Sequence, residues 1–181
     1  LLKMIQQTFL FDKQTEFTIE ANPEGVSLAK AELLRGWGVN RVSLGTQSFQ
    51  DHYLKFLGRC HDVRQAIETF HTFRKAGFEN VNVDLMYSFP DQTSEDIMRD
   101  VQSLIELQSE HVSLYTLMVE PQSRFYAKNL TETENQLQAE QYQLVVRLLA
   151  AAGLQQYEVS NFARRGWESQ HNLIYWKGGN Y

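Results

Sequence analysis

The sequence contains a single cysteine, Cys60, and only three prolines among its 181 residues. One cysteine excludes a disulfide within this chain and any cysteine-rich metal site built from this chain alone. We interpret Cys60 as a small buried apolar residue rather than a nucleophile. Because no disulfide framework is present, we expect the protein to work in the reducing cytoplasm.

The chain also lacks an excess of positive charge and any long apolar run. Its 17 Lys and Arg residues stand against 22 Asp and Glu residues, and the net charge of −5 argues against a nucleic-acid-binding surface. No apolar run approaches the roughly 18 residues of a membrane-spanning helix. The start has neither a signal peptide nor an initiator Met, so we expect the chain to be part of something longer.

An apolar fraction of 43% is enough for a packed core of one domain or part of one. Strand-like and helix-like segments alternate along the chain, which predicts βα units and a parallel sheet. The predicted strands are Phe17–Ala21, Arg41–Gly45, Asn80–Met86, His111–Leu117 and Leu154–Val159.

Caps and glycine stops predict the helices between these strands. They run from Ser27 to Trp37, over Gln50–Phe56 and Val63–Ala76, from Thr93 or Ser94 to Leu107, and from a capping box at Thr133–Gln136 to Ala152. The residues from Asn161 onward are expected to be irregular.

Four short apolar runs each end in an isolated polar group, namely Glu20, Gln47, Asp84 or Tyr115. A buried polar group needs a partner, because leaving it unpaired costs several kcal/mol. In parallel α/β sheets ligands sit at the carboxyl ends of the strands. The residues alone therefore predict an α/β domain with a polar ligand site at that edge.

Seven motifs follow one another along the chain. They are Glu20–Pro23, Asn40–Phe49, Leu57–His61, Asp84–Thr93, Ser113–Tyr115, Tyr157–Ala163 and His171–Trp176. Together they resemble the radical S-adenosylmethionine (SAM) family of oxygen-independent coproporphyrinogen III oxidase-like proteins, most closely its heme-chaperone branch. The resemblance covers nearly the whole chain from Thr15 onward.

The resemblance implies an α/β fold that is part of a (β/α)6 TIM-like partial barrel, with about five parallel strands and outer helices. Residues 1–160 would be the C-terminal portion of the barrel, and residues 161–181 would begin a post-barrel segment with the HNxxYW motif. In this family SAM binds a [4Fe–4S] cluster held by a Cys-x3-Cys-x2-Cys loop. That loop is absent from this chain, so the cluster ligands would lie outside it, and this chain alone would be inactive.

Four residues are implied to contact SAM. Glu20 matches the family residue that holds the ribose, since a carboxylate accepts two hydrogen bonds from a vicinal diol. Gln47 matches a ribose or carboxylate contact, Arg59 pairs with the SAM carboxylate, and Asp84 is a further pocket residue. The alternatives are a helix-capping or ion-pairing role for Glu20, a turn amide for Gln47 and a surface salt bridge for Arg59.

The Asp84–Thr93 motif departs from the family pattern at two positions. Ser88 and Asp91 stand where the family commonly has glycine. If the backbone needs a positive φ there, this loop should be altered or strained.

The HNxxYW form implies that His171 is an axial ligand of heme, with Tyr175 and Trp176 packing on the porphyrin. The alternative is a structural histidine. His61, beside Arg59, is expected to support the SAM pocket, whereas His111 is interpreted simply as a residue at the start of a strand.

Three functions are compatible with these features. The first is part of a radical SAM heme chaperone that binds SAM, a cluster and heme and delivers heme to a client hemoprotein. The second is a coproporphyrinogen III oxidase of porphyrin biosynthesis, and the third is a non-catalytic binding module. Because part of the barrel would be missing, the isolated chain is expected to self-associate.

Overall fold

The computed structural model describes residues 1–12 and 14–179, and a sheet forms its centre. Within these residues the sheet has six strands in the order β1-β2-β3-β4-β6-β5. Their bounds are β1 (Thr18–Ala21), β2 (Arg41–Gln47), β3 (Asn80–Tyr87), β4 (His111–Thr116), β5 (Gln155–Gln156) and β6 (Asn161–Ala163). Strands β1 to β4 are parallel, whereas β6 runs antiparallel to both β4 and β5.

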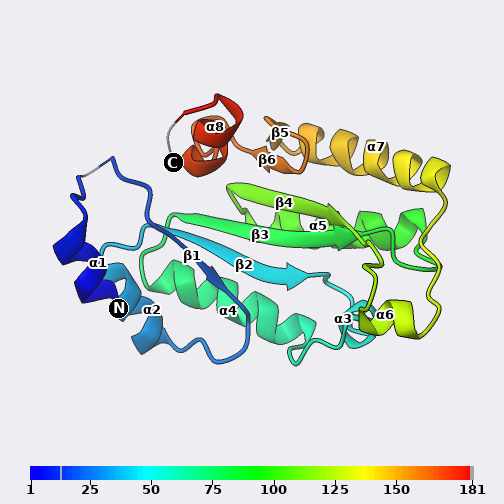
Figure 1. Cartoon of the computed structure of the whole chain (residues 1–181), viewed down its shortest axis with the longest axis horizontal. Helices are drawn as coiled ribbons and strands as arrows, with labels where there is room; N and C mark the ends of the chain where they lie inside the picture. The colour runs from blue at the N-terminus through cyan, green and yellow to red at the C-terminus, as the bar shows by residue number, and fades with distance from the viewer. Residues whose placement is uncertain (13, 180–181) are drawn as a thin grey trace.

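The helices of the described part are α1 (Leu2–Thr8), α2 (Leu28–Gly36), α3 (Asp51–Leu57), α4 (Val63–Lys75), α5 (Ser94–Leu107), α6 (Arg124–Ala127), α7 (Asn135–Ala151) and α8 (Gln170–Trp176). Figure 1 shows α4 and α5 behind the sheet and α8 beside the sheet, toward the beginnings of β3 and β4. The predicted α/β class, with a mostly parallel sheet and outer helices, is confirmed.

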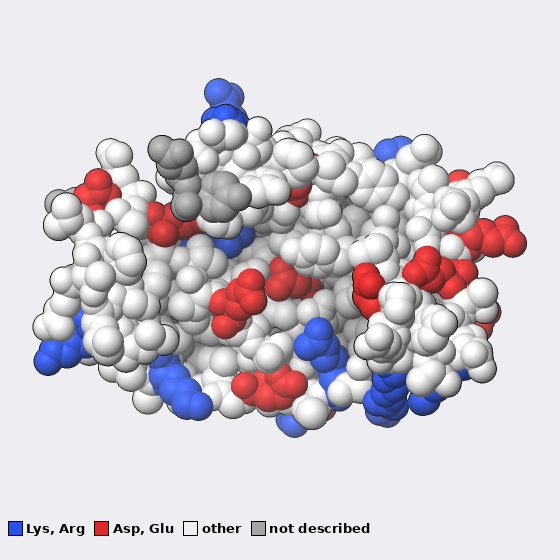
Figure 2. All heavy atoms as spheres, viewed as in Figure 1, with Lys and Arg blue, Asp and Glu red and all other residues white. Residues whose placement is uncertain are grey.

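The two faces of the sheet differ sharply in polarity, because side chains alternate along each strand. One face carries buried apolar residues such as Val42, Val83 and Val112, which pack with Phe73 of α4 and Leu104 of α5. The opposite face carries the polar residues of the same strands. In Figure 2 acidic side chains gather over the middle of this polar face.

The predicted fifth parallel strand is wrong, and so is the prediction of an irregular segment after it. Only Gln155–Gln156 of that region is extended, and the chain then turns and returns as β6. The carboxylate of Glu158 accepts hydrogen bonds from the backbone N–H of Ser160 and the side-chain amide of Asn161. This polar turn closes a hairpin, which is antiparallel by construction.

One of the predicted helix starts is also wrong in its detail. Thr93 begins α5 with a capping box to Asp96, as expected. Helix α7, by contrast, has Glu134 at its N-cap and no side-chain cap bond. The Thr133 hydroxyl instead donates to the carbonyl of Ser88 at 3.1 Å, so it joins the start of α7 to the loop after β3.

Candidate functional site

A pocket of about 480 Å³ opens on the polar face of the sheet. Its walls come from β1, β2, β4, β6 and α8, and they include Glu20, Arg41, Tyr115 and His171. Phe17 and Arg41, which line it, lie where β1 and β2 begin. The pocket therefore extends from the beginnings of β1 and β2 to Tyr115 near the end of β4, whereas the sequence pointed to the carboxyl ends of the strands alone.

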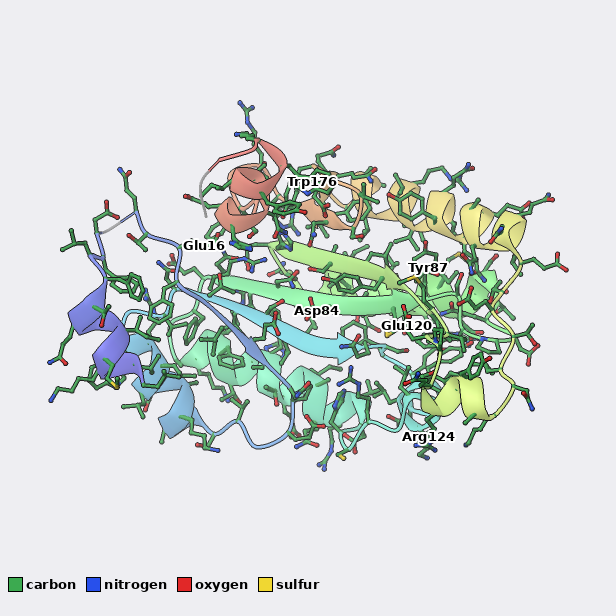
Figure 3. All side chains as sticks on the ribbon, in the orientation of Figure 1. Glu16, Asp84, Tyr87, Glu120, Arg124 and Trp176 are labelled. Atoms are coloured by element: carbon green, nitrogen blue, oxygen red, sulfur yellow. The ribbon has the colours of Figure 1, made fainter. Side chains whose placement is uncertain are left out.

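A hydrogen-bonded cluster of side chains adjoins this pocket on the polar face of the sheet. Ser43 of β2 donates to the Asp84 carboxylate at 3.1 Å, and the Asn82 amide donates to the same carboxylate at 2.7 Å. Asn82 also donates to Ser113 of β4 at 3.0 Å. Burial raises the pKa of Asp84 above its usual value, against the opposing effect of these hydrogen bonds. Figure 3 places Asp84 in the middle of the sheet.

His111 extends the cluster toward the C-terminal segment, a role that sequence reasoning missed. Its Nδ1 lies 2.6 Å from the Asn82 side-chain oxygen, and its Nε2 lies 2.6 Å from the Tyr157 hydroxyl. Burial, with a smaller effect of the Arg41 charge, lowers the pKa of His111 to about 2. The ring is therefore neutral, with Nδ1–H donating to Asn82 and Nε2 accepting from Tyr157.

Helix α8 is fixed to the rest of the molecule by carboxylates at both of its ends. Glu16 accepts hydrogen bonds from the Ser169 hydroxyl at 3.1 Å and from the backbone N–H of Gln170 at 2.9 Å. At the other end, the Trp176 indole donates to Glu158 at 3.1 Å. Figure 3 labels Glu16 beside the start of α8 and Trp176 on the helix itself. This arrangement holds His171 at the wall of the pocket.

The predicted SAM residues fall into two pairs. Glu20 is exposed and lines the pocket. Asp84 is joined to the pocket by Ser43, which lines it and donates to the Asp84 carboxylate. Gln47 and Arg59 lie instead at the carboxyl end of β2, around Asn22. The Arg59 guanidinium donates to the Asn22 side-chain oxygen at 3.4 Å, in an exposed contact.

Tyr115, for which the sequence offered no role, belongs with the first pair. It lines the same pocket as Glu20. Burial raises the pKa of Tyr115, and the negative charges of Asp84, Glu158 and Glu20 raise it further. Its phenol therefore stays protonated and lies in the field of these carboxylates.

Gly45 lets the Asn22 and Gln47 motifs approach one another. A Cβ at Gly45 would lie 3.1 Å from Asn22 Oδ1 and 3.2 Å from Gln47 Nε2. The strand is irregular at this point, because its register with β3 shifts between Leu44 and Gln47. Gln47 has a φ of 70°, so its side chain leaves the regular alternation of the strand.

The loop after β3 has the strained backbone that its departure from the family glycines implied. Ser88 has a φ of 63° and Asp91 a φ of 59°. The Ser88 hydroxyl donates to the buried Gln141 of α7 at 2.7 Å. A buried hydrogen bond thus accompanies the strained conformation at Ser88.

Asp100 anchors the segment that follows Gln47, and sequence reasoning did not single it out. It accepts from the Ser48 hydroxyl at 2.8 Å and from the Phe49 backbone N–H at 2.9 Å. Burial raises the pKa of Asp100 to about 6. Its place among Ile97, Val101 and Leu104, on the buried side of α5, was a signal available in the sequence.

The Cys60–His61 pair reverses one expectation and supports another. Cys60 is exposed, so its interpretation as a buried apolar residue is wrong; it lies in the loop after α3 has ended at the left-handed Gly58. His61 is buried, with Nε2 3.2 Å from the carbonyl oxygen of Thr46. It therefore supports the backbone just before Gln47.

The described residues contain neither a metal-binding cluster nor a membrane-spanning helix. No cluster of three or more His, Cys, Asp or Glu side chains there could hold a metal ion. The described helices include none with the length and apolarity needed to cross a membrane.

The model of the radical SAM superfamily matches residues 1–104. The heme chaperone HemW of Bacillus subtilis is 40% identical over 173 residues, covering 92% of this chain and 45% of the relative. The mitochondrial radical S-adenosyl methionine domain-containing protein 1 of Bos taurus is 37% identical over 185 residues, covering 100% of this chain and 42% of the relative. The chain thus spans about half the length of the curated relatives that it matches.

Among solved structures, the coproporphyrinogen III oxidase HemN of Escherichia coli, a radical SAM enzyme, superposes with a TM-score of 0.81. It is 25% identical, and the match covers 98% of this chain and 41% of that one. An archaeal Elp3 from Methanocaldococcus infernus has a TM-score of 0.62 at 19% identity, a likeness of fold alone.

Proposed function

Since this chain belongs to the radical SAM superfamily, we propose that it is part of a heme chaperone that binds SAM and heme and delivers heme to a client hemoprotein. The observation that carries the proposal is the position of His171, on a fixed helix and at the wall of a pocket that Glu20 also lines. The relatives named heme chaperones support it.

The heme site would form on the pocket side of α8. An imidazole is a common axial ligand of heme iron, and the anchoring by Glu16 and Glu158 orients the helix that carries His171. Tyr175 and Trp176 are 55% and 58% exposed and pack edge to face. Their rings offer apolar surface for a porphyrin face.

The SAM site would use the two pairs described above. The exposed Glu20 carboxylate suits the ribose diol, and Arg59 suits a carboxylate because its guanidinium can bind both oxygens at once. Asp84 and Gln47 complete the set, and the closeness of Asn22, Gly45 and Gln47 joins the two motifs.

The chain's own residues do not fit a [4Fe–4S] cluster, which needs several thiolate ligands, because Cys60 is the single cysteine. The ligands of the cluster would therefore come from residues outside this chain. We further propose that residues 1–160 are barrel, that residues 161–181 begin the post-barrel segment, and that the protein works in the cytoplasm.

A heme titration of the full-length protein tests the assignment. We expect His171→Ala to weaken heme binding at least tenfold and to change the Soret band, because an axial ligand is lost. The matched control is His71→Ala, which removes an exposed imidazole from the outer helix α4. Equal affinity and equal spectra in wild type and His171→Ala would exclude His171 as the ligand.

The structural likeness to coproporphyrinogen III oxidase supports a second candidate, oxidative decarboxylation of coproporphyrinogen III. An anaerobic assay with the reconstituted full-length protein, SAM and a reductant separates the two. A heme chaperone yields no protoporphyrinogen, so turnover of coproporphyrinogen III would favour the oxidase. Absence of both turnover and heme binding would favour the non-catalytic binding module.

A further inference from the structure

Arg41 is a buried cation that lacks a partner in the described part of the chain. It begins β2, points to the polar face and is only 5% exposed. Its Nε is buried and has no hydrogen-bond partner, and no described carboxylate lies within ion-pair distance of the guanidinium. Burying a charge without a partner is costly, and an arginine cannot relieve that cost by losing its proton.

The polar groups around Arg41 are already occupied by one another. Ser43 and Asn82 hold Asp84, Ser113 donates to Asn161 at 2.7 Å, and Glu16 holds the start of α8. The guanidinium therefore stands apart from this network, although its charge reaches Asp84 and His111. It lines the same pocket of about 480 Å³ as His171.

We propose that the Arg41 guanidinium binds a carboxylate group of the ligand that occupies this pocket. A planar carboxylate can accept two parallel hydrogen bonds from the guanidinium. A carboxylate carries a single negative charge, which suits a pocket that Glu16 and Glu20 also line, since a phosphate would be repelled more strongly.

The class of ligand follows from the other wall of the pocket and rests on the proposed function. His171 would bind the heme iron, and the propionates are the carboxylates of heme. Arg41 would then bind the propionates of a tetrapyrrole at the polar face, and the apolar part of the tetrapyrrole would lie against α8. Arg41 is thus a ligand-binding residue that recognises carboxylates, separate from iron ligation.

The experiment measures binding of three probes to the full-length protein: heme, metal-free protoporphyrin IX and protoporphyrin IX dimethyl ester. We expect Arg41→Gln to weaken heme and protoporphyrin IX about tenfold or more, as removal of a charge-assisted hydrogen bond does. The ester should bind wild type as weakly as the free acid binds Arg41→Gln. Arg41→Lys, which keeps the positive charge but cannot donate two parallel hydrogen bonds, should recover part of the affinity. The control is Arg64→Gln, which removes an exposed arginine of α4.

Thermal melting of the ligand-free variants separates a binding residue from a structural one. We expect Arg41→Gln to leave the melting temperature unchanged or to raise it, because an unpartnered buried charge disappears. A fall in melting temperature would mean that Arg41 pairs with a group of the protein itself, and it would overturn the proposal.

Equal affinity of wild type and Arg41→Gln for protoporphyrin IX would also overturn the proposal, and would leave the heme proposal intact. If wild type binds neither heme nor protoporphyrin IX, the proposed function and the tetrapyrrole assignment fail together. If Arg41→Gln weakens protoporphyrin IX while His171→Ala leaves heme unchanged, only the iron ligand is wrong.

Discussion

The imidazole Nε2 of His111 lies 2.6 Å from the hydroxyl of Tyr157. His111 is fully buried at the start of β4, and Tyr157 leads into the β5–β6 turn. The same hydroxyl accepts from the Ser169 backbone N–H at 3.3 Å and from the Asn172 amide at 3.2 Å. One phenol therefore joins the sheet to the first turn of the helix that carries His171.

Tyr157→Phe should destabilise the fold and loosen α8. The change leaves the buried Nε2 of His111 without a donor, which costs about 1–3 kcal/mol in the free energy of unfolding. We expect a lower midpoint in urea and faster proteolysis near residues 169–176. Tyr126→Phe is the control, because Tyr126 is 58% exposed. If both variants behave alike, the Tyr157 hydroxyl has no such role.

Asp100 should make stability depend on pH. Its pKa is about 6 in the folded protein and about 4 in an unfolded chain, so the folded state binds more protons between these values. The Asp100 contribution to the free energy of unfolding is therefore present below pH ~4 and is lost as the pH rises through 6, by up to about 3 kcal/mol.

Urea titrations of wild type and Asp100→Asn between pH 4 and 7 measure this slope. The difference between the two free energies should change across the window, because the amide does not titrate. A constant difference at every pH would show that the carboxyl is not perturbed. The part of the difference in the free energy of unfolding that is the same at every pH reports only the hydrogen bonds of Asp100 that an asparagine amide cannot form.

Glycine substitutions in the loop after β3 should have opposite effects at its two left-handed positions. Asp91→Gly removes left-handed strain of about 1 kcal/mol from an exposed residue, so stability should stay equal or rise slightly. Ser88→Gly also breaks the bond to the buried Gln141, a loss of about 1–3 kcal/mol. Denaturant midpoints check both, and equal shifts would contradict the role given to the Ser88 hydroxyl.

Gly45→Ala should disturb the junction of the two motifs to which we assign SAM binding. The added Cβ would press on Asn22 and Gln47, and overpacking of this kind costs about 1–3 kcal/mol. Calorimetry with the full-length protein should show weaker SAM binding. Gly36→Ala serves as the control, since nothing lies within 4 Å of a Cβ there. Unchanged SAM affinity in Gly45→Ala would argue against this part of the site.

The isolated chain should self-associate. Within the described residues β1 pairs with β2 only, so its outer edge offers unpaired backbone groups. The apolar side chains of Phe9 and Leu10 are also exposed. Light scattering should detect oligomers whose proportion rises with concentration. A monodisperse monomer with a sharp cooperative melt would show that the edge of β1 does not cause association.

The sequence by itself determined the class of fold, the first four strands and helices α2 to α5 and α7, whereas it did not predict α1, α6 or α8. These features depend on local patterns: the capping box at Thr93, the glycine after α4 and the alternation in Val81–Leu85. The motifs also identified Glu20, Gln47, Arg59, Asp84 and His171 as candidates, and no further geometry was needed for that.

Only the tertiary structure decided how those residues are grouped. The register that sets Asn82 beside His111, the antiparallel return of β6 and the burial of Arg41 all join segments far apart in the chain. A local pattern shows that side chains alternate, but it does not show which strand pairs with which or in what register. For that reason, three of the four polar groups that the sequence presented as strand endings, Glu20, Asp84 and Tyr115, prove to belong to one polar face, whereas Gln47 leaves the alternation of its strand.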